Sequence, residues 1–138
     1  MSFEIKRLSE ENAAAVAEIE KLCFSHPWSE ATVCSEIKSG FSDFFGAFEE
    51  EKLAGYIGGR TIAGETEIFN VAVSPEFRRK GIAKALIEKF IETISVAGAI
   101  AVGVSVASAI FRMYSYFQNQ QFKQRENMVI RYDRDNNK

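Results

Sequence analysis

A stretch in the middle of the chain, from Glu67 to Ile94, constrains the fold more than any other part of the sequence. It contains an apolar run rich in β-branched and aromatic residues, Ile68 to Val73, which a Ser-Pro pair ends. Such a run predicts a buried strand. Farther along, apolar residues recur at the spacing of one helical face, namely Ile82, Leu86, Phe90, Ile91 and Ile94. The stretch therefore predicts a strand, a turn and a helix that begins near Gly81.

The turn before this helix is strongly basic. Arg78, Arg79 and Lys80 precede Gly81, and Lys84 follows it. The first N–H groups of a helix lack intrahelical acceptors and lie at the positive end of the helix dipole. A helix start of this kind attracts phosphate. Charge alone leaves a second interpretation open, in which the cations form a solvated connection between strand and helix.

The order strand, turn, loop and helix resembles that of the GNAT superfamily of acetyl-CoA-dependent N-acetyltransferases. Arg78-x-x-Gly81-x-Ala83, directly after a strand that ends in Val-Ala-Val, is similar to the superfamily's Q/R-x-x-G-x-G/A pyrophosphate loop. Neither the Walker A motif nor the dinucleotide fingerprint is present. The resemblance implies that acetyl-CoA is the cosubstrate. It also implies that the pyrophosphate is held by Arg78, Arg79, Lys80, Gly81, Ile82, Ala83 and Lys84, and the pantetheine by backbone N–H groups of Val71, Ala72 and Val73.

The remaining elements before this stretch follow from periodicity and turn signals. The first helix is expected to bury a stripe made of Ala15, Ile19, Leu22 and Cys23, with Glu18, Glu20 and Lys21 elsewhere. An acidic turn, Glu49 to Lys52, is expected to join a hairpin, and Gly58-Gly59 indicates a bulge or a close backbone approach. The predicted elements are a strand over 3–8, helices over 10–24 and from a Ser29 cap to about 38, and strands over 43–48, 53–62 and 65–73.

After the central helix the pattern predicts a fifth strand over 100–106, a helix over 107–118 and two short strands around 122–124 and 128–132. With 138 residues and 46% hydrophobic content, the chain is expected to form one domain, 1–138. The resemblance implies an α/β (α+β) GNAT fold with a mixed sheet of six to seven strands and helices on both faces. The fourth and fifth strands would splay apart, and pantetheine would lie between them.

The resemblance also suggests the catalytic residues. The segment after Ala107 is similar to the superfamily's S-N-x-x-A-x-x-x-Y-x-x-x-G-F stretch, whose tyrosine protonates the departing CoA thiolate. Counting from Ser108 identifies Tyr116, with Tyr114 as the alternate, while a packing role for both stays open. A phenol of pKa about 10 can protonate a thiolate of pKa about 8.5. Glu67 is the carboxylate nominated for a proton relay, or else an exposed charge at a strand end.

Within the superfamily, the chain looks most like the bacterial ribosomal-protein-alanine N-acetyltransferases, where a turn similar to Pro27-Trp28-Ser29 lies beside the acceptor-peptide groove. Trp28 could equally fill the core. At pH 7 an α-amine of pKa about 7.8 is roughly 14% neutral and a lysine about 0.04%, a gap of about 3.5 kcal/mol. Without a strong base, an N-terminal amine is therefore the more accessible acceptor.

Two rival functions stay open. One is a small-molecule amine acetyltransferase on the same fold. The other is a catalytically weakened, CoA-binding regulatory domain. Three departures from the family pattern motivate it: Ala109 replaces an asparagine, Gln121 replaces a glycine, and Gly103 or Ser105 stands where these enzymes carry a glutamate on the fifth strand.

Charge and composition limit the classes of binding partner that the sequence predicts. The net charge of -2 argues against a general nucleic-acid partner. No run approaches the roughly 18 apolar residues of a membrane helix, and the charged amino terminus is unlike a signal peptide, so a cytoplasmic protein without a membrane partner is expected. One histidine and two cysteines make no ligand set, so no metal is expected. A monomer or weak homodimer is expected, acting on a protein N-terminus or a small amine.

Overall fold

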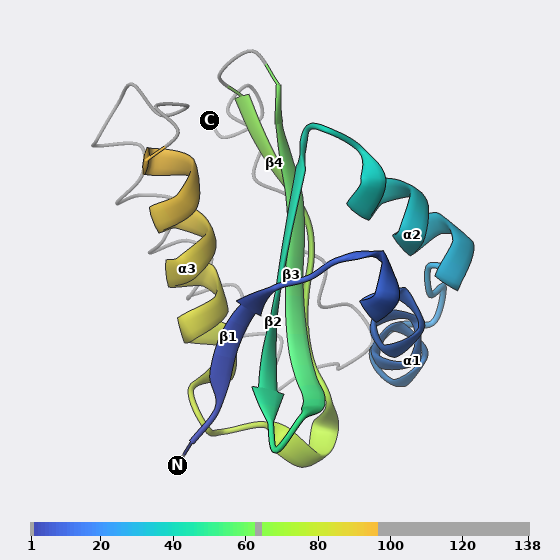
Figure 1. The fold of residues 1–138 in the computed structure, drawn as a ribbon. Helices are drawn as coiled ribbons and strands as arrows, with labels where there is room; N and C mark the ends of the chain where they lie inside the picture. The colour runs from blue at the N-terminus through green and yellow to red at the C-terminus, as the bar shows by residue number, and fades with distance from the viewer. Residues whose placement is uncertain (1, 63–64, 97–138) are drawn as a thin grey trace.

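The computed structural model describes residues 2–62 and 65–96 of the protein (Figure 1). All six elements predicted up to residue 73 are present, as is the helix after Gly81. The bounds are β1 Glu4–Arg7, α1 Ala13–Cys23, α2 Glu30–Lys38, β2 Ser42–Glu49, β3 Lys52–Ile62, β4 Glu65–Val73 and α3 Ile82–Val96, with short 3-10 helices η1 Glu10–Asn12 and η2 Pro75–Phe77. The elements predicted after residue 96 lie outside the described residues.

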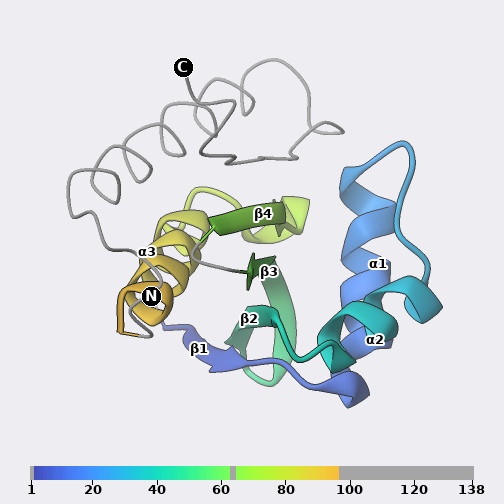
Figure 2. The same ribbon diagram turned by 90° about the horizontal axis from the view of Figure 1, so that it is seen from above.

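The four strands form one antiparallel sheet in the order β1-β2-β3-β4. Helix α3 packs on one face of the sheet, and α1 and α2 cover the other, as Figure 2 shows from above. This arrangement confirms the predicted class of α and β elements with helices on both faces. The strands that would complete a mixed sheet, and the predicted splay beside β4, fall outside the described residues.

Helix α2 begins where its sequence signal places it. The Ser29 side chain accepts a hydrogen bond from the Thr32 backbone N–H at 3.1 Å, which satisfies one of the donors that a helix start leaves open. Val33 is fully buried, and the helix ends at Lys38. The predicted N-cap and the predicted end of this helix are therefore confirmed.

The buried face of α1 differs from the prediction. Ala15 is exposed and Leu22 is 58% exposed, whereas the buried residues are Ala13, Val16, Ala17, Ile19, Glu20 and Cys23. The real stripe still follows helical spacing, but Glu20 occupies one of its positions. A pattern that assigns every charged side chain to solvent rotates the predicted face away from the true one. The carboxylate is tolerated inside because it is fully hydrogen-bonded, as described below.

Both interpretations of Gly58-Gly59 are confirmed. The β3–β4 register shifts between these glycines, so that Phe69 is an extra residue on β4. A Cβ on Gly58 would lie 2.3 Å from the Phe44 ring, and one on Gly59 would lie 2.6 Å from the Glu67 carbonyl oxygen and 2.7 Å from the Phe90 ring. The glycines therefore let aromatic side chains approach the sheet closely on both of its faces.

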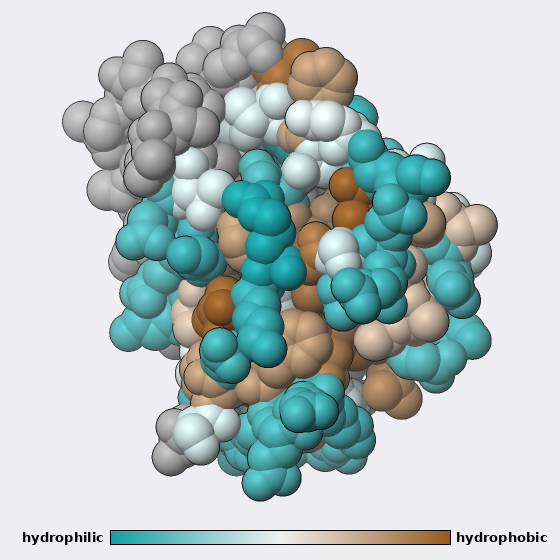
Figure 3. All heavy atoms as spheres, viewed as in Figure 1, coloured by the Kyte–Doolittle hydropathy of each residue, from teal (hydrophilic) through white to brown (hydrophobic). Residues whose placement is uncertain are grey.

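The acidic hairpin turn is also confirmed. Glu49 pairs with Lys52, and Glu50 and Glu51 between them have φ angles of 51° and 70°. Hydrophilic atoms cover this lower tip of the molecule in Figure 3, and hydrophobic atoms emerge higher up, beside the sheet. The core itself lies between the sheet and the helices on each face.

Replacing Gly59 by alanine should destabilise the fold by about 1–3 kcal/mol, the usual cost of overpacking, because one of the atoms in the way is backbone. Gly40→Ala is the matched control, since a Cβ there meets nothing within 4 Å. Its expected effect is within about 0.5 kcal/mol. Urea denaturation of both variants compares the free energies of unfolding. Equal midpoints would contradict the close approach seen at Gly59.

Candidate functional site

The outer edge of β4 presents backbone amides. Ser74 donates its N–H to the Ala54 carbonyl oxygen at 2.8 Å, so the residue at the end of β4 is directed toward β3. Amide direction alternates along an antiparallel strand, which directs Ala72 toward β3 and Val71 and Val73 away from it. Within residues 2–62 and 65–96, β4 pairs only with β3. Of the three residues predicted to hold pantetheine, Val71 and Val73 are the ones whose N–H groups reach this edge.

The start of α3 has the geometry of an anion cradle. The Ala85 N–H bonds to the Gly81 carbonyl oxygen at 3.1 Å, so the helix offers no acceptor to the N–H groups of Gly81, Ile82 and Ala83. Gly81 has a φ of 81°, and a Cβ built on it would meet nothing within 4 Å. The side chains of Ile82 and Ala83 are buried, so a ligand would meet only their backbone. These features fit a diphosphate.

Arg78 has a different environment from the rest of the loop. Its Nε donates to the Val73 carbonyl oxygen at 2.8 Å, and its Nη2 lies 3.4 Å from the Cys23 Sγ. Burial raises the pKa of the Cys23 thiol, and the Arg78 charge partly opposes that shift. The guanidinium therefore ties the end of β4 to α1, and its side chain is engaged within the fold.

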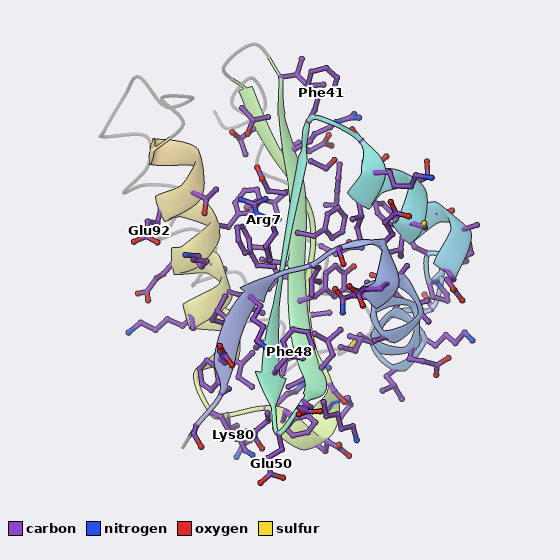
Figure 4. The ribbon with its side chains drawn as sticks, in the orientation of Figure 1. Arg7, Phe41, Phe48, Glu50, Lys80 and Glu92 are labelled. Atoms are coloured by element: carbon purple, nitrogen blue, oxygen red, sulfur yellow. The ribbon has the colours of Figure 1, made fainter. Side chains whose placement is uncertain are left out.

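The other cations of the loop lie closer to solvent. Lys80 pairs with Glu49 at 3.2 Å and lies 5.2 Å from the centre of the Phe77 ring. Figure 4 shows Lys80 at the same end of the molecule as Glu50, in the hairpin turn. Arg79, with a φ of 68°, and Lys84 are exposed. The predicted cluster is therefore present, with part of its charge balanced by the hairpin.

The predicted relay carboxylate lies on the α1 and α2 side of the sheet. Glu67 pairs with Arg60 at 3.7 Å, and its side chain is 30% exposed. The same guanidinium lies 5.5 Å from the centre of the Phe69 ring. Glu67 is therefore an ion-paired, half-buried carboxylate rather than an isolated charge. Tyr116 and Tyr114 lie outside the described residues.

A buried polar cluster beside β4 was missed by the sequence analysis. Glu20 is 1% exposed, and its carboxylate accepts hydrogen bonds from the Trp28 backbone N–H at 2.8 Å, the Asn70 Nδ2 at 2.8 Å and the Tyr56 hydroxyl. Asn70 also donates to the Tyr56 oxygen at 3.0 Å. The one signal that could have revealed it is the place of Glu20 between Val16 and Cys23 on one helical stripe.

Burial dominates the titration of this cluster. Desolvation raises the pKa of Glu20, and the hydrogen bonds from Trp28, Tyr56 and Asn70 partly offset it. The pKa of Tyr56 lies well above its usual value, because the phenol is buried and faces the Glu20 carboxylate. Among the residues that the structure describes, no three His, Cys, Asp or Glu side chains are grouped as a metal site. None of the described helices is long and apolar enough to cross a bilayer.

Within the described residues, β4 has outward amides on the side away from β3, and a helix start suited to an anion follows it; together they would suit an elongated ligand that carries a diphosphate. Comparison with known proteins gives the family. A family model described as "Acetyltransferase (GNAT) family" matches residues 13–119, and the chain belongs to that family. The protein is therefore an N-acetyltransferase whose cosubstrate is acetyl-CoA.

A similar sequence and a similar solved structure carry a name that specifies an acceptor. The [ribosomal protein bS18]-alanine N-acetyltransferase of Escherichia coli K12 is 27% identical over 105 residues, which cover 76% of this chain and 70% of that protein. A crystal structure of the ribosomal-protein-S18-alanine N-acetyltransferase from Escherichia coli has a TM-score of 0.68 at 25% identity, over 80% of this chain and 75% of that one.

A further solved structure shows the fold alone. The PaiA N-acetyltransferase of Thermoplasma acidophilum, in complex with coenzyme A, has a TM-score of 0.66 at 24% identity, over 72% of this chain and 76% of that one.

The buried Glu20 should make stability depend on pH in a defined direction. Its folded-state pKa lies above the ordinary value of 4.5, so its contribution to stability is fully present below pH 4.5 and is lost as the pH rises through the folded-state pKa. Glu20→Gln has no such titration. The stability of the wild type relative to this variant should therefore fall from pH 4 toward neutrality, as measured by urea unfolding at each pH.

Glu18→Gln is the matched control, because Glu18 lies on the exposed side of the same helix. It removes a helix charge without touching the buried cluster. A difference between the wild type and Glu20→Gln that stays constant from pH 4 to pH 7 would contradict a raised pKa at Glu20.

Proposed function

We propose that the protein transfers the acetyl group of acetyl-CoA to the N-terminal α-amine of a protein that begins with alanine. The observation that carries this proposal is the similarity to the Escherichia coli alanine N-acetyltransferase in both sequence and structure. The match of the family model over residues 13–119 also supports the expectation that residues 1–138 form a single N-acetyltransferase domain.

We infer that described residues would hold two parts of the cosubstrate, the pantetheine and the diphosphate. The outward N–H groups of Val71 and Val73 would hold pantetheine, as a neighbouring strand would be held, and would polarise the acetyl carbonyl. The N–H groups of Gly81, Ile82 and Ala83 would hold the diphosphate, with positive charge from Arg79, Lys80 and Lys84. Arg78 would contribute indirectly, by fixing the Val73 carbonyl. Acetyl-CoA supplies an activated thioester at this edge.

The acceptor would approach β4 from the side of α1 and α2. Helix α3 covers the other face of the sheet, where Ile82 and Phe90 are buried. The α1 and α2 face carries Glu67 on β4 and the partly exposed Trp28 in the turn between the two helices. An amine bound on this face would lie on the side that holds the proposed relay carboxylate.

Two side chains would move protons. The amine must lose a proton to react, and Glu67 would receive it through a water chain, while Arg60 keeps the carboxylate in place. The departing thiolate must gain a proton, and Tyr116 would donate it, with Tyr114 as the alternate. These assignments distribute the two proton transfers between a base on β4 and an acid later in the chain.

A panel of acceptors tests the proposed function. The full chain with acetyl-CoA should acetylate a free peptide that begins with alanine, with a kcat/KM above that for spermidine or for the same peptide blocked at its N-terminus and carrying an internal lysine. Thiol release gives the rate, and mass spectrometry of the product locates the acetyl group. A higher kcat/KM for spermidine would identify a small-molecule acetyltransferase. Thermal stabilisation by acetyl-CoA without thiol release on any of these amines would identify a regulatory domain.

The pH profile separates the two proposed proton carriers. Tyr116→Phe should lower kcat by about 10²-fold at every pH, because the thiolate then leaves without a proton. Glu67→Gln should lower kcat/KM at pH 7 but recover near pH 9, where an α-amine of pKa about 7.8 is already neutral. Both are measured by thiol release with the alanine peptide.

Tyr114→Phe is the matched control for the acid, since it removes the neighbouring phenol. If it lowers kcat as much as Tyr116→Phe does, the assignment of the acid to residue 116 fails. A loss at Glu67→Gln that persists unchanged at pH 9 would remove Glu67 from the proton relay.

A further inference from the structure

We propose that Glu20 is a positioning residue for the acceptor: its carboxylate fixes the turn that carries Trp28, so that Trp28 and Phe69 form one wall of the acceptor subsite. The inference rests on the proposed function in two ways: it names the acceptor as a protein N-terminus, and it takes Glu67 as the group that receives the amine's proton. It assigns a role to a buried residue of α1 that is hydrogen-bonded to Asn70 on β4.

Glu20 joins three separate parts of the fold. One carboxylate oxygen accepts the Trp28 backbone N–H, and the other accepts from Tyr56 on β3 and Asn70 on β4. A carboxylate accepts stronger hydrogen bonds than a neutral group does, and three donors satisfy this one. The turn after α1 is therefore held to the sheet by a charge-assisted bond to its backbone, independent of the side chain at position 28.

The bulge on β4 supplies the other half of the arrangement. Because Phe69 is the extra residue, both Phe69 and Asn70 lie on the α1 and α2 side: Asn70 bonds to Glu20, and Phe69 meets Trp28 with ring centres 5.4 Å apart at 51°. The Phe69 ring is also in contact with Phe44, at 6.3 Å between centres, and with the Arg60 guanidinium. Two contacts thus fix the position of the Trp28 ring: the hydrogen bond from its backbone N–H to Glu20 and the contact of its ring with Phe69.

This ring pair has the properties of a binding wall. Phe69 is 7% exposed and lies behind Trp28, which keeps part of its own surface exposed. Arg60 connects Phe69 to Glu67, so the wall is continuous with the carboxylate proposed to receive the amine's proton. An acceptor with its first residue against Trp28 would present its amine toward Glu67. Burial raises the pKa of Glu20. The proposed role, to hold Trp28 in one position, would explain why a carboxylate is buried here.

Intrinsic fluorescence tests the positioning step without any assay of activity. Trp28 is the single tryptophan of the chain, so its emission reports this turn alone. Glu20→Ala should shift the emission to longer wavelength and increase quenching by acrylamide, whereas Glu20→Gln should stay close to wild type, because its amide oxygen can still accept from the Trp28 N–H. Ile19→Ala is the matched control: Ile19 is buried on the same helix, and its variant should keep the wild-type emission. Unchanged emission in Glu20→Ala would overturn the proposal.

Steady-state kinetics test the effect on acceptor binding. Glu20→Ala should raise KM for the alanine peptide about tenfold or more and leave KM for acetyl-CoA within about twofold. Glu20→Gln and Ile19→Ala should both have a peptide KM close to that of the wild type. A purely structural role would change Glu20→Ala and Ile19→Ala alike. If Glu20→Ala does not fold, Tyr56→Phe replaces it in both experiments, and a smaller shift of the same sign is expected, about threefold in KM.

The two proposals fail differently. If the wild type acetylates spermidine in place of the peptide, the proposed function is wrong, and the same KM comparison is made with spermidine. An acceptor KM in Glu20→Ala equal to that of wild type, for whichever amine is turned over, overturns the role of Glu20 itself.

Discussion

The register of β4 on β3 is the constraint on which the rest of the site depends. The shift at Gly58-Gly59 inserts Phe69, and from there to Val73 the register determines the direction of every backbone amide and side chain. It sends the N–H groups of Val71 and Val73 to the outer edge, and it brings Phe69 and Asn70 to the same face. A slip of one residue would reverse both outcomes, because side chains and amides alternate along a strand. The glycines permit this register by leaving room for Phe44 and Phe90.

The proposed anion site at the start of α3 depends more on backbone than on charge. Gly81 has a left-handed backbone conformation and open surroundings, which a ligand close to the main chain needs. The buried side chains of Ile82 and Ala83 hold the start of the helix against the core. The cations are partly committed elsewhere: Arg78 to the Val73 carbonyl and Lys80 to Glu49. The Lys80 pair with Glu49 is part-buried, so in the proposed function Lys80 would have to exchange this partner for the diphosphate. Arg78, half-buried and bonded to backbone, keeps its structural place.

The buried cluster around Glu20 places a carboxylate in the interior, where its desolvation costs free energy. Burying a carboxylate costs free energy unless every acceptor site is used, and here three donors converge on it. No described buried side-chain polar atom lacks a hydrogen-bond partner. The arrangement fixes α1, the following turn and β4 relative to each other with a directionality that apolar packing lacks. That directionality is what the proposed acceptor wall would require.

Local patterns in the sequence were enough for the strand, basic loop and helix between Glu67 and Val96, because apolar periodicity, the Ser-Pro break and Gly81 act over a few residues. The Ser29 cap, the hairpin turn and the Gly58-Gly59 irregularity are local in the same sense.

Contacts between segments that are distant in the sequence decided where the charged side chains of the site lie. The inward position of Glu20 depends on donors at 28, 56 and 70, and the pairing of Glu67 depends on Arg60 across the sheet. The turning of Arg78 toward Val73 and Cys23 likewise joins α1 to the end of β4. Hydrophobic periodicity contains no information about such partners, because a charged side chain is buried only where the folded chain brings its hydrogen-bond donors together.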